Sequence, residues 1–291
     1  MARLFRYLLL SAVFGSLIYG AWRLIAPRPT IDGGYVAFVD VGQGDAAVVR
    51  FPTGETVVID GGPGDQAHKL MAKLDEYGVT SIDLMIATHP HSDHIDGLTS
   101  ILRSMRVAEV WHNGLEHATP SAQEFQKAMK ESSAKIVVAR KGRSTAFDGG
   151  RIDVLAPIDP LLRGTTSDAN NNSIVARVTL GGVRLLFTGD MQEEQRRQAY
   201  LARADLRADV LKVAHHGSAD GTDSAFLRRV RPKLAVISCG DRNVHGHPHR
   251  ETIEALIKAK VPVRRTDQDG TVVITPARVG LRIFAEKSKG G

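Results

Sequence analysis

A run of six residues constrains this chain more than any other feature: His89-Pro90-His91-Ser92-Asp93-His94. The run follows a nearly continuous apolar segment, residues 82–88, which predicts a buried strand, and it opens a stretch with helical periodicity. Imidazole and carboxylate groups are good ligands for zinc and its neighbours among the transition metals. At a strand-to-helix turn, His89 and His91 can converge on one ion, while Asp93 and His94 point from the helix start toward a second. The spacing therefore predicts a metal site.

Beyond Tyr35, short apolar segments alternate with polar helical ones, and strands come in pairs at both ends of this region. The expected strands are residues 35–41, 45–51, 56–60, 82–88, 108–112, 135–139, 151–156, 173–180, 183–188, 209–214, 234–238, 271–275 and 281–285. The expected helices are residues 66–77, 93–105, 121–131, 191–203, 224–230 and 252–259. This pattern favours two sheets with helices outside, an α/β four-layer αββα sandwich, over a singly alternating parallel sheet. We expect one domain over residues 35–286 and a frayed tail at 287–291.

The N-terminal segment differs in character from the rest. Sixteen uncharged, mostly apolar residues, 7–22, follow Arg3 and Arg6, and three more apolar residues follow Arg23. A spanning helix needs ~20 apolar residues, so we expect one transmembrane helix over residues 1–26 and a linker over 27–34. A cleaved signal peptide and a buried or interfacial helix are the alternatives. Arg3 and Arg6 favour a single-pass membrane protein with a cytoplasmic N-terminus and an exported catalytic domain.

Composition narrows the class of site and partner. The single cysteine, Cys239, excludes an intramolecular disulfide and a cysteine-rich zinc module. The formal net charge of +6 suits an anionic partner. Three basic clusters, residues 140–143, 228–231 and 264–265, are candidate phosphate contacts, with an ordinary solvated surface as the alternative.

The histidine-rich run resembles the signature of the metallo-β-lactamase superfamily. Residues 57–62 are similar to the family's early strand, whose terminal aspartate, Asp60 here, supports the metal loop. Residues 185–190 are similar to the strand whose last residue, Asp190 here, bridges two metals. The resemblance implies the metallo-β-lactamase fold and a binuclear site. It implies that the metal ligands include the five residues His89, His91, Asp93, His94 and Asp190.

Four further segments resemble one branch of that superfamily, the exported hydrolase domains of ComEC-type DNA-uptake proteins. They are residues 40–46, 170–173, 211–218 and 243–248, and they occur in the order found in that branch. The family's lone histidine before the bridging aspartate has no counterpart in a recognisable motif here. The double histidine implies that His216 supplies the missing ligand and that His215 polarises a substrate oxygen, with the reverse assignment left open.

The same resemblance suggests roles for the remaining candidates. His247 is expected to complete the coordination of the metal held by Asp93 and His94. Asp45 is expected near the metals, either supporting the ligands from behind or accepting a proton. Asp93, His215 and Asp45 are therefore the candidate catalytic residues. The residues expected to support the site from behind the ligands are Asp60, Asp40, Asn172 and Ser218.

A pair of divalent ions activates water and clamps the attacking and leaving oxygens of a hydrolysed bond. We expect two such ions, Zn²⁺ with Mn²⁺ as an alternative, in a phosphodiesterase or nuclease related to DNA uptake or processing. The expected partners are an anionic substrate such as DNA and a membrane. Because one fold supports many hydrolyses, a hydrolase of a lactone, a β-lactam or a choline-phosphate ester is the second hypothesis. A non-catalytic binding module is the third.

Overall fold

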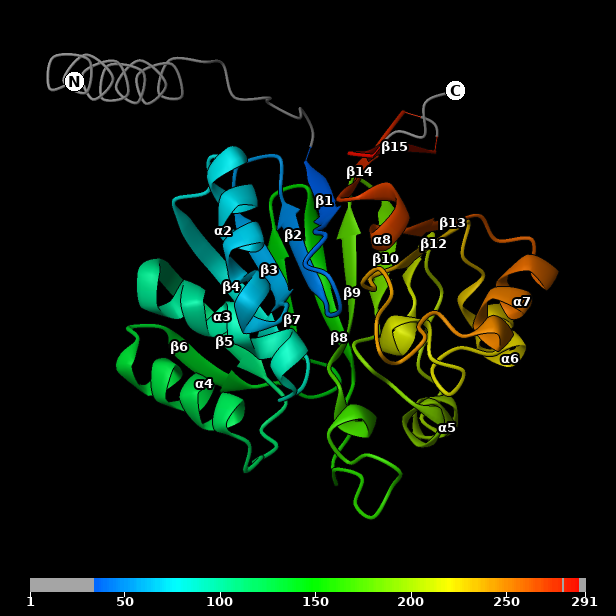
Figure 1. Cartoon of the computed structure of the whole chain (residues 1–291), viewed down its shortest axis with the longest axis horizontal. Coiled ribbons are helices and arrows are strands. Elements are labelled where there is room, and N and C mark those ends of the chain that lie inside the picture. Colours follow the sequence, from blue (N-terminus) through cyan, green and yellow to red (C-terminus); the bar gives the residue numbers. More distant parts are fainter. Residues whose placement is uncertain (1–33, 279, 288–291) are drawn as a thin grey trace, which may run out of the picture. The chain divides into compact units, whose positions relative to one another are not determined.

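The computed structural model describes residues 34–278 and 280–287, which build two sheets packed face to face (Figure 1). The first sheet has eight strands in the order β15-β14-β1-β2-β3-β4-β5-β6. The second has seven strands in the order β13-β12-β11-β10-β9-β8-β7. Helices α2, α3 and α4 lie on one side of the pair of sheets, and α5, α6 and α7 lie on the other. The predicted αββα sandwich is confirmed.

The strands of the first sheet are β1 (Tyr35–Phe38), β2 (Ala46–Arg50), β3 (Thr56–Gly61), β4 (Ser81–Ala87), β5 (Arg106–His112), β6 (Lys135–Val138), β14 (Val272–Pro276) and β15 (Leu281–Ala285). Those of the second are β7 (Ser144–Phe147), β8 (Gly150–Ala156), β9 (Val175–Leu180), β10 (Val183–Phe187), β11 (Val210–Lys212), β12 (Leu234–Ile237) and β13 (Val263–Arg265). The helices are α2 (Ala67–Glu76), α3 (Ser92–Ser104), α4 (Pro120–Glu131), α5 (Glu193–Leu201), α6 (Ser224–Val230), α7 (Arg250–Lys258) and α8 (Thr266–Asp269). Three 3₁₀ turns, η1 (Gly64–Gln66), η2 (Asn170–Asn172) and η3 (Ala214–Gly217), complete the set.

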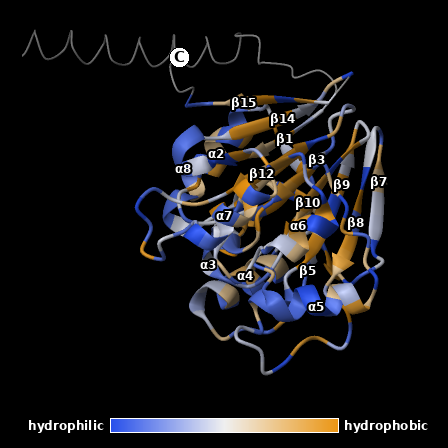
Figure 2. Cartoon of the chain, turned by 90° about the vertical axis from the view of Figure 1, so that its right-hand side faces the viewer, coloured by the Kyte–Doolittle hydropathy of each residue, from blue (hydrophilic) through white to orange (hydrophobic). Residues whose placement is uncertain are grey.

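Most central strands are apolar on both faces, because each sheet packs against the other sheet on one face and against helices on the other. Along β1, Val36 and Phe38 face the core between the sheets, whereas Tyr35 and Ala37 pack under the outer helices. Phe38 stacks on Phe187 of the opposite sheet at 5.5 Å between ring centroids. Figure 2 shows these apolar strands inside and more polar segments outside. This is why the strands appear in the sequence as continuous apolar runs rather than as alternating ones.

The strand directions bring the predicted motifs to one end of the sandwich. β3, β4 and β5 run parallel, and β10, β11 and β12 run parallel in the other sheet. The residues that follow β3, β4, β10 and β11 therefore gather at the carboxyl ends of their strands. β1 is antiparallel to β2, which is antiparallel to β3. Residue 34 consequently enters the domain at the end opposite these motifs.

Some elements were not expected from the sequence. The two edge strands of the second sheet, β7 and β13, and the short helix α8 belong to this group. Lys287, expected at the start of a frayed tail, pairs with Asp40 at 3.1 Å. Within the described part of the chain, no helix is long and apolar enough to cross a membrane. The expected anchor over residues 1–26 and most of the linker lie outside the described residues.

Candidate metal centre

Asp190 lies in a tight turn directly after β10. Gly189 takes a φ of +49° there, and a Cβ on it would approach Ser173 and Thr88 to 3.0 Å. The amide of Asp190 donates to Ser173 Oγ at 3.1 Å, and Thr188 Oγ1 donates to the carbonyl of Lys212 at 2.7 Å. These bonds hold the Asp190 carboxylate, whose residue is 2% exposed, in a fixed position beneath the surface.

The histidine-rich run connects β4 to α3, as the sequence predicts. His91 occupies the N-cap position of α3. The first turns of this helix pack directly on the end of β3, since a Cβ on Gly97 would lie only 1.9 Å from the carbonyl oxygen of Gly61. Glycine at residue 97 therefore allows the close approach that brings Asp93 and His94 over the ends of the strands.

One group of ligand atoms comes from Asp93, His94, Asp190 and His216, and these atoms all lie within 4.8 Å of one another. His94 Nε2 is 3.3 Å from Asp190 Oδ1, and His216 Nε2 is 3.6 Å from Asp190 Oδ2. His216 Nε2 is also 3.2 Å from Asp93 Oδ2. This is a two-imidazole, two-carboxylate donor set.

A second group consists of His89, His91 and Asp190. His89 Nε2 lies 3.6 Å from Asp190 Oδ2 and 3.0 Å from His91 Nδ1. Asp190 is therefore common to both groups, with one side chain in reach of two neighbouring cation positions. This placement agrees with the bridging role expected for it.

The hydrogen-bonding pattern fits a divalent cation. His94 Nε2, His216 Nε2 and Asp190 Oδ1 are buried without any hydrogen-bond partner. The opposite ring atoms are held, because His94 Nδ1 lies 2.9 Å from Asp60 Oδ2 and His216 Nδ1 lies 2.9 Å from the Ser238 carbonyl oxygen. A buried unpaired polar atom costs about 1–3 kcal/mol. Imidazoles whose second nitrogen is held in this way are the usual ligands of zinc and related metals.

The electrostatics of the cluster also favour the binding of cations. Burial opposes ionisation of Asp190, but the imidazoles of His94, His216 and His89 hold its pKa well below its usual range. Burial likewise opposes the charged form of His216, yet Asp190 and Asp45 raise its pKa to about 10. For His94, burial is outweighed by Asp190, Asp93 and Asp60, so its pKa is raised well above the ordinary value. The carboxylates thus attract cations, which are protons when no metal ion is bound.

The two histidine ligands expected outside the first run lie in different surroundings. His216 was expected to supply the ligand that the family's lone histidine provides, and it groups with Asp93, His94 and Asp190. We expected His247 beside Asp93 and His94, but within the described residues it belongs to no candidate ligand group. Its ring centroid lies 6.1 Å from that of His216, and its Nδ1 is 3.4 Å from Gln43 Nε2. His216 therefore takes the position that was expected for His247.

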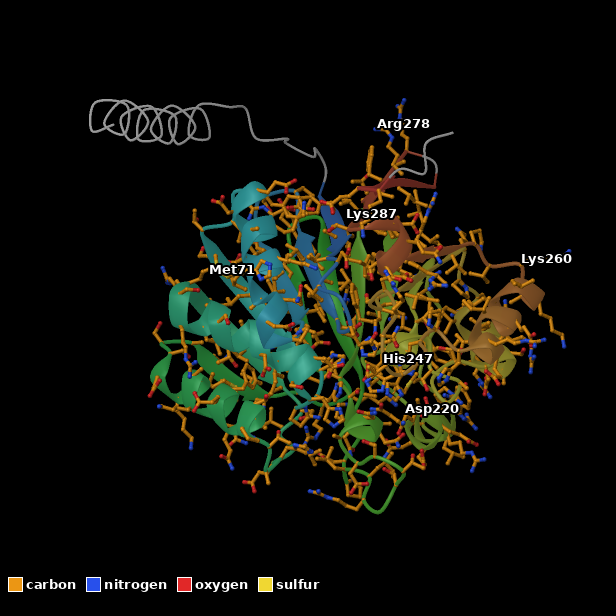
Figure 3. The ribbon with its side chains drawn as sticks, viewed as in Figure 1. Met71, Asp220, His247, Lys260, Arg278 and Lys287 are labelled. Carbon is orange, nitrogen blue, oxygen red and sulfur yellow. The ribbon has the colours of Figure 1, made fainter. Side chains whose placement is uncertain are left out.

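His215 lies at the rim of the centre and is held by a residue that the motifs did not indicate. Its Nδ1 is 3.0 Å from Asp220 Oδ1, and its Nε2 is 3.8 Å from Asp190 Oδ2 (Figure 3 labels Asp220 and His247). His215 and His216 both adopt left-handed φ values, +50° and +53°. Such values are rare outside glycine. They let two consecutive side chains lie close to the same centre, as functional sites often require.

Asp60 and Asp45 lie close to the ligands, as expected. Asp60 accepts hydrogen bonds from Thr88 N and Thr88 Oγ1, both at 2.8 Å, in addition to its contact with His94. Asp45 lies 3.3 Å from His216 Nδ1. It also forms an ion pair with Lys212, a buried residue that sequence analysis did not single out. The signal was present, since a lysine in the otherwise apolar strand before the double histidine is unusual.

Three other residues that were expected to support the site, Asp40, Asn172 and Ser218, stabilise the backbone of nearby turns and loops instead. Asp40 Oδ1 accepts from the amide of Gly42 at 3.2 Å, so Asp40 stabilises its own turn. Asn172 holds the backbone of the preceding loop through Leu162 and Asp168. Asn170, with Nδ2 3.5 Å from His215 Nε2, is the asparagine that contacts the rim of the centre. The amide of Ser218 donates to the His215 carbonyl at 2.7 Å and closes the double-histidine turn.

Most members of the three basic clusters are engaged within the fold. Arg140 pairs with Asp159, and Arg143 pairs with Glu109 and stacks on Trp111. Other engaged members are Lys141 with the Ala202 carbonyl, Arg229 with the Tyr200 ring, Arg264 with Asp269 and Arg265 with Asp267. These contacts favour the alternative of an ordinary surface over dedicated phosphate clusters.

Comparison with known proteins places this geometry in context. The model of the metallo-beta-lactamase superfamily matches residues 39–241. ComE operon protein 3 of Bacillus subtilis is 29% identical over 82% of this chain, and competence protein ComA of Neisseria gonorrhoeae is 26% identical over 84%. This chain covers 32% of the length of each, so it spans about a third of these relatives. Endoribonuclease YSH1 of Candida albicans is 20% identical over 54% of this chain and 20% of its own length.

Among solved structures, the metallo-beta-lactamase fold protein YhfI from Bacillus subtilis superposes with a TM-score of 0.54 at 14% identity. The match covers 80% of this chain and 96% of that protein. At this level of identity the similarity concerns the fold, and it agrees with the two-sheet arrangement described above.

Proposed function

The chain belongs to the metallo-β-lactamase superfamily, and from that premise we propose that it is a binuclear metal-dependent phosphodiesterase that cleaves nucleic acid. Its similarity to competence proteins confirms the resemblance to the hydrolase domains of ComEC-type proteins. The observation that carries the proposal is the pair of ligand groups that share Asp190 in one buried cluster. A decayed binding module would lack part of such a set.

Each candidate ion has its own set of ligands, and the two sets share Asp190. His89, His91 and Asp190 would hold one ion, and Asp93, His94, Asp190 and His216 would hold the other. When bound, such ions activate water and neutralise charge that develops on a phosphoryl group. Each of the two ions is Zn²⁺ or Mn²⁺, because imidazole and carboxylate ligands suit both metals.

The chain's own contribution is to orient these ligands and the substrate. Asp60 and the Ser238 carbonyl fix the rings of His94 and His216 with Nε2 directed into the cluster. Asp220 fixes the ring of His215, whose Nε2 is directed toward Asp190 and Asn170 at the rim. We propose that His215 and Asn170 contact an oxygen of the bound substrate.

The choice of nucleic acid rests on the relatives and on charge. One relative is named ComE operon protein 3, another is named competence protein ComA, and a more distant one is named an endoribonuclease. The formal net charge of +6 favours the approach of a polyanion. A β-lactam or a lactone has no comparable support, since the solved structures indicate the fold alone.

We also propose that residues 1–26 anchor the domain in a membrane, with the catalytic domain exported. Residue 34 joins β1 at the end of the sandwich opposite the metal ligands, as the strand directions require. An anchor attached there would leave the candidate centre at the far end of the domain.

The decisive experiment is a metal-supplemented activity screen of the full-length protein. The substrates are single-stranded DNA, double-stranded DNA, RNA, a generic phosphodiester, a β-lactam and a lactone, each with Zn²⁺, Mn²⁺ or EDTA. We expect metal-dependent cleavage of a nucleic acid or diester that His89→Ala abolishes and that His68→Ala, an exposed histidine on α2, retains. Hydrolysis of only the β-lactam or lactone contradicts the substrate, and metal-independent cleavage contradicts the mechanism.

A further inference from the structure

Lys212, the last residue of β11, is 3% exposed, which is rare for a lysine. Its amine forms an ion pair with Asp45 Oδ2, and Asp45 is itself 5% exposed. The amine also lies 3.5 Å from the carbonyl oxygen of Gly189, next to Asp190. A buried charge persists only when a partner compensates for the lost hydration. The pair therefore links the turn after β1 to the turn that carries Asp190.

Asp45 lies behind the imidazoles of the metal cluster. Its Oδ1 is 3.3 Å from His216 Nδ1, and its Oδ2 is 3.8 Å from His94 Nδ1. These are the ring atoms opposite the Nε2 atoms that face Asp190. The amide of Asp45 also donates to the carbonyl of Asp93 at 3.1 Å. A displacement of Asp45 would therefore disturb Asp93, His94 and His216, three of the four residues in the group that also contains Asp190.

The charges around the centre show why a fixed cation is needed there. Four carboxylates lie in contact with its imidazoles, those of Asp45, Asp60, Asp93 and Asp190. Among residues 34–278 and 280–287, Lys212 is the one lysine or arginine that forms an ion pair with any of them. Unlike a bound divalent ion, the amine of Lys212 belongs to the chain itself.

Asp45 also belongs to a third potential ligand group, with Asp60 and His94. In this group the cation next to Asp45 is already present, as the ammonium of Lys212. A carboxylate oxygen in an ion pair of this kind is less available to a metal. This explains how a cluster with a third set of ligand atoms can serve a two-metal site.

We propose that Lys212 is a positioning residue of the metal centre: its ion pair with Asp45 holds that carboxylate behind His94 and His216 and keeps it from ligating a metal. This inference rests on the metal centre of the proposed function. A buried ion pair that served packing alone would make a different prediction. Its loss would destabilise the metal-loaded and the metal-free protein equally, because packing does not depend on the ions.

The test compares three full-length variants with wild type, each with bound Zn²⁺ and after EDTA treatment. Lys212→Met removes the charge with little change in length, and the double variant Asp45→Asn/Lys212→Met removes both charges. Lys233→Met, which breaks the pair between the exposed Lys233 and Asp209, is the matched control. We expect Lys212→Met to lower the unfolding temperature several degrees more in EDTA than in Zn²⁺. The double variant is expected to recover most of that loss, because no uncompensated charge stays buried.

Co²⁺ substitution supplies a second measurement that packing would not change. In Lys212→Met the freed Asp45 carboxylate can enter the metal shell, so the visible absorption bands of bound Co²⁺ are expected to shift. The bands of the double variant and of Lys233→Met are expected to match those of wild type. Should Lys212→Met fail to fold, a folded double variant with wild-type bands still supports the proposal.

The outcomes separate this inference from the proposed function. Equal losses in Zn²⁺ and EDTA, no recovery in the double variant, or unchanged Co²⁺ bands in Lys212→Met would overturn the role of Lys212. Failure of both Lys212 variants to fold would likewise overturn it in favour of packing. Wild-type protein that binds neither Zn²⁺ nor Co²⁺ would instead contradict the proposed metal centre itself.

Discussion

The Oδ2 atom of Asp60 lies 2.9 Å from the Nδ1 atom of His94, while Asp60 Oδ1 accepts a hydrogen bond from the amide of Thr88. One carboxylate at the end of β3 thus holds both the strand end before the histidine-rich run and a ring within that run. Because Nδ1 is engaged, Nε2 is the atom of His94 that is directed toward Asp190. Support of this kind behind the ligands determines how well a metal site is preorganised.

Asp60→Asn is therefore expected to weaken metal binding without removing a ligand. The amide keeps the shape but carries no charge and can present its NH₂ group to His94 Nδ1. We expect a 10–100-fold loss of metal affinity, the usual effect of removing such a partner, measured by competition with a chromogenic chelator. Asp40→Asn is the control, since Asp40 pairs with Lys287 away from the ligands, and it is expected to bind metal like wild type.

Asp190→Asn addresses the residue shared by the two ligand groups. The substitution removes a charge that would be divided between two cations, while the shape is nearly preserved. We expect at least one ion to bind more weakly and turnover to fall by about 10²–10⁴-fold, as for other essential electrostatic or acid–base groups. Metal content and initial rates measure this.

Asp205→Asn provides the comparison for Asp190→Asn. Asp205 lies on the surface, paired with Arg177 at 3.3 Å and Arg207 at 3.0 Å. Exposed pairs of this kind contribute little, about 0–1 kcal/mol, so near wild-type behaviour is expected. Full activity and two bound ions in Asp190→Asn would mean that the turn after β10 has only a structural role.

The pH dependence of stability is expected to differ between the metal-free and metal-loaded proteins. In the metal-free protein the pKa of His216 is about 10, because burial is outweighed by Asp190 and Asp45. Since this lies above the unfolded value of ~6.5, protonation of His216 stabilises the fold. That contribution is complete below about pH 6.5 and is lost as the pH rises through 10.

We therefore expect the unfolding temperature in EDTA to fall as the pH rises from 6.5 to 10. Protein loaded with Zn²⁺ before the titration is expected to lack this decline, because its ligands are bound to metal rather than to protons. Parallel curves for the two samples would show that His94 and His216 do not bind the ions. Thermal unfolding followed by circular dichroism provides the comparison.

A chain that starts at Thr30 is expected to fold and to lose membrane retention. The buried clusters of the described structure begin at Tyr35 and are formed by the two sheets and their helices. The truncated protein is expected to be soluble, with the same metal-dependent unfolding transition as the full chain. Insolubility and the absence of a cooperative transition would place the N-terminal segment in the core instead.

Local sequence patterns predicted most of the fold. Helix α6 and strand β15 have the predicted bounds, and the other predicted elements agree to within a few residues. The two missed strands, β7 and β13, are the edges of the second sheet. Edge strands are short and half exposed, so their residues carry a weak apolar pattern. Their extended conformation is stabilised by pairing with a neighbouring strand rather than by their own composition.

In the candidate site, too, local sequence patterns predicted one part and missed another. His89, His91, Asp93 and His94 were identified because four ligands lie in one continuous run, whose geometry depends on a single turn. Asp60 and Asp190 were identified from the family resemblance, but the grouping of the distant residues around the ligands needed the tertiary structure. The consecutive left-handed conformations of His215 and His216 determine which ring joins Asp93 and which stays at the rim. The double-histidine motif favoured His216 as the ligand but left the reverse assignment open.

The sequence by itself determined the sandwich class and the histidine-rich run, because both follow from short-range periodicity and spacing. Only the tertiary structure decided that His216 rather than His247 joins Asp93 and His94, and that Asn170 rather than Asn172 contacts the rim. It also brought Lys212 against Asp45. These contacts join strand ends from two different sheets, and their distances depend on how the sheets pack face to face. Packing of that kind is a property of the whole folded chain and leaves no local pattern in the sequence.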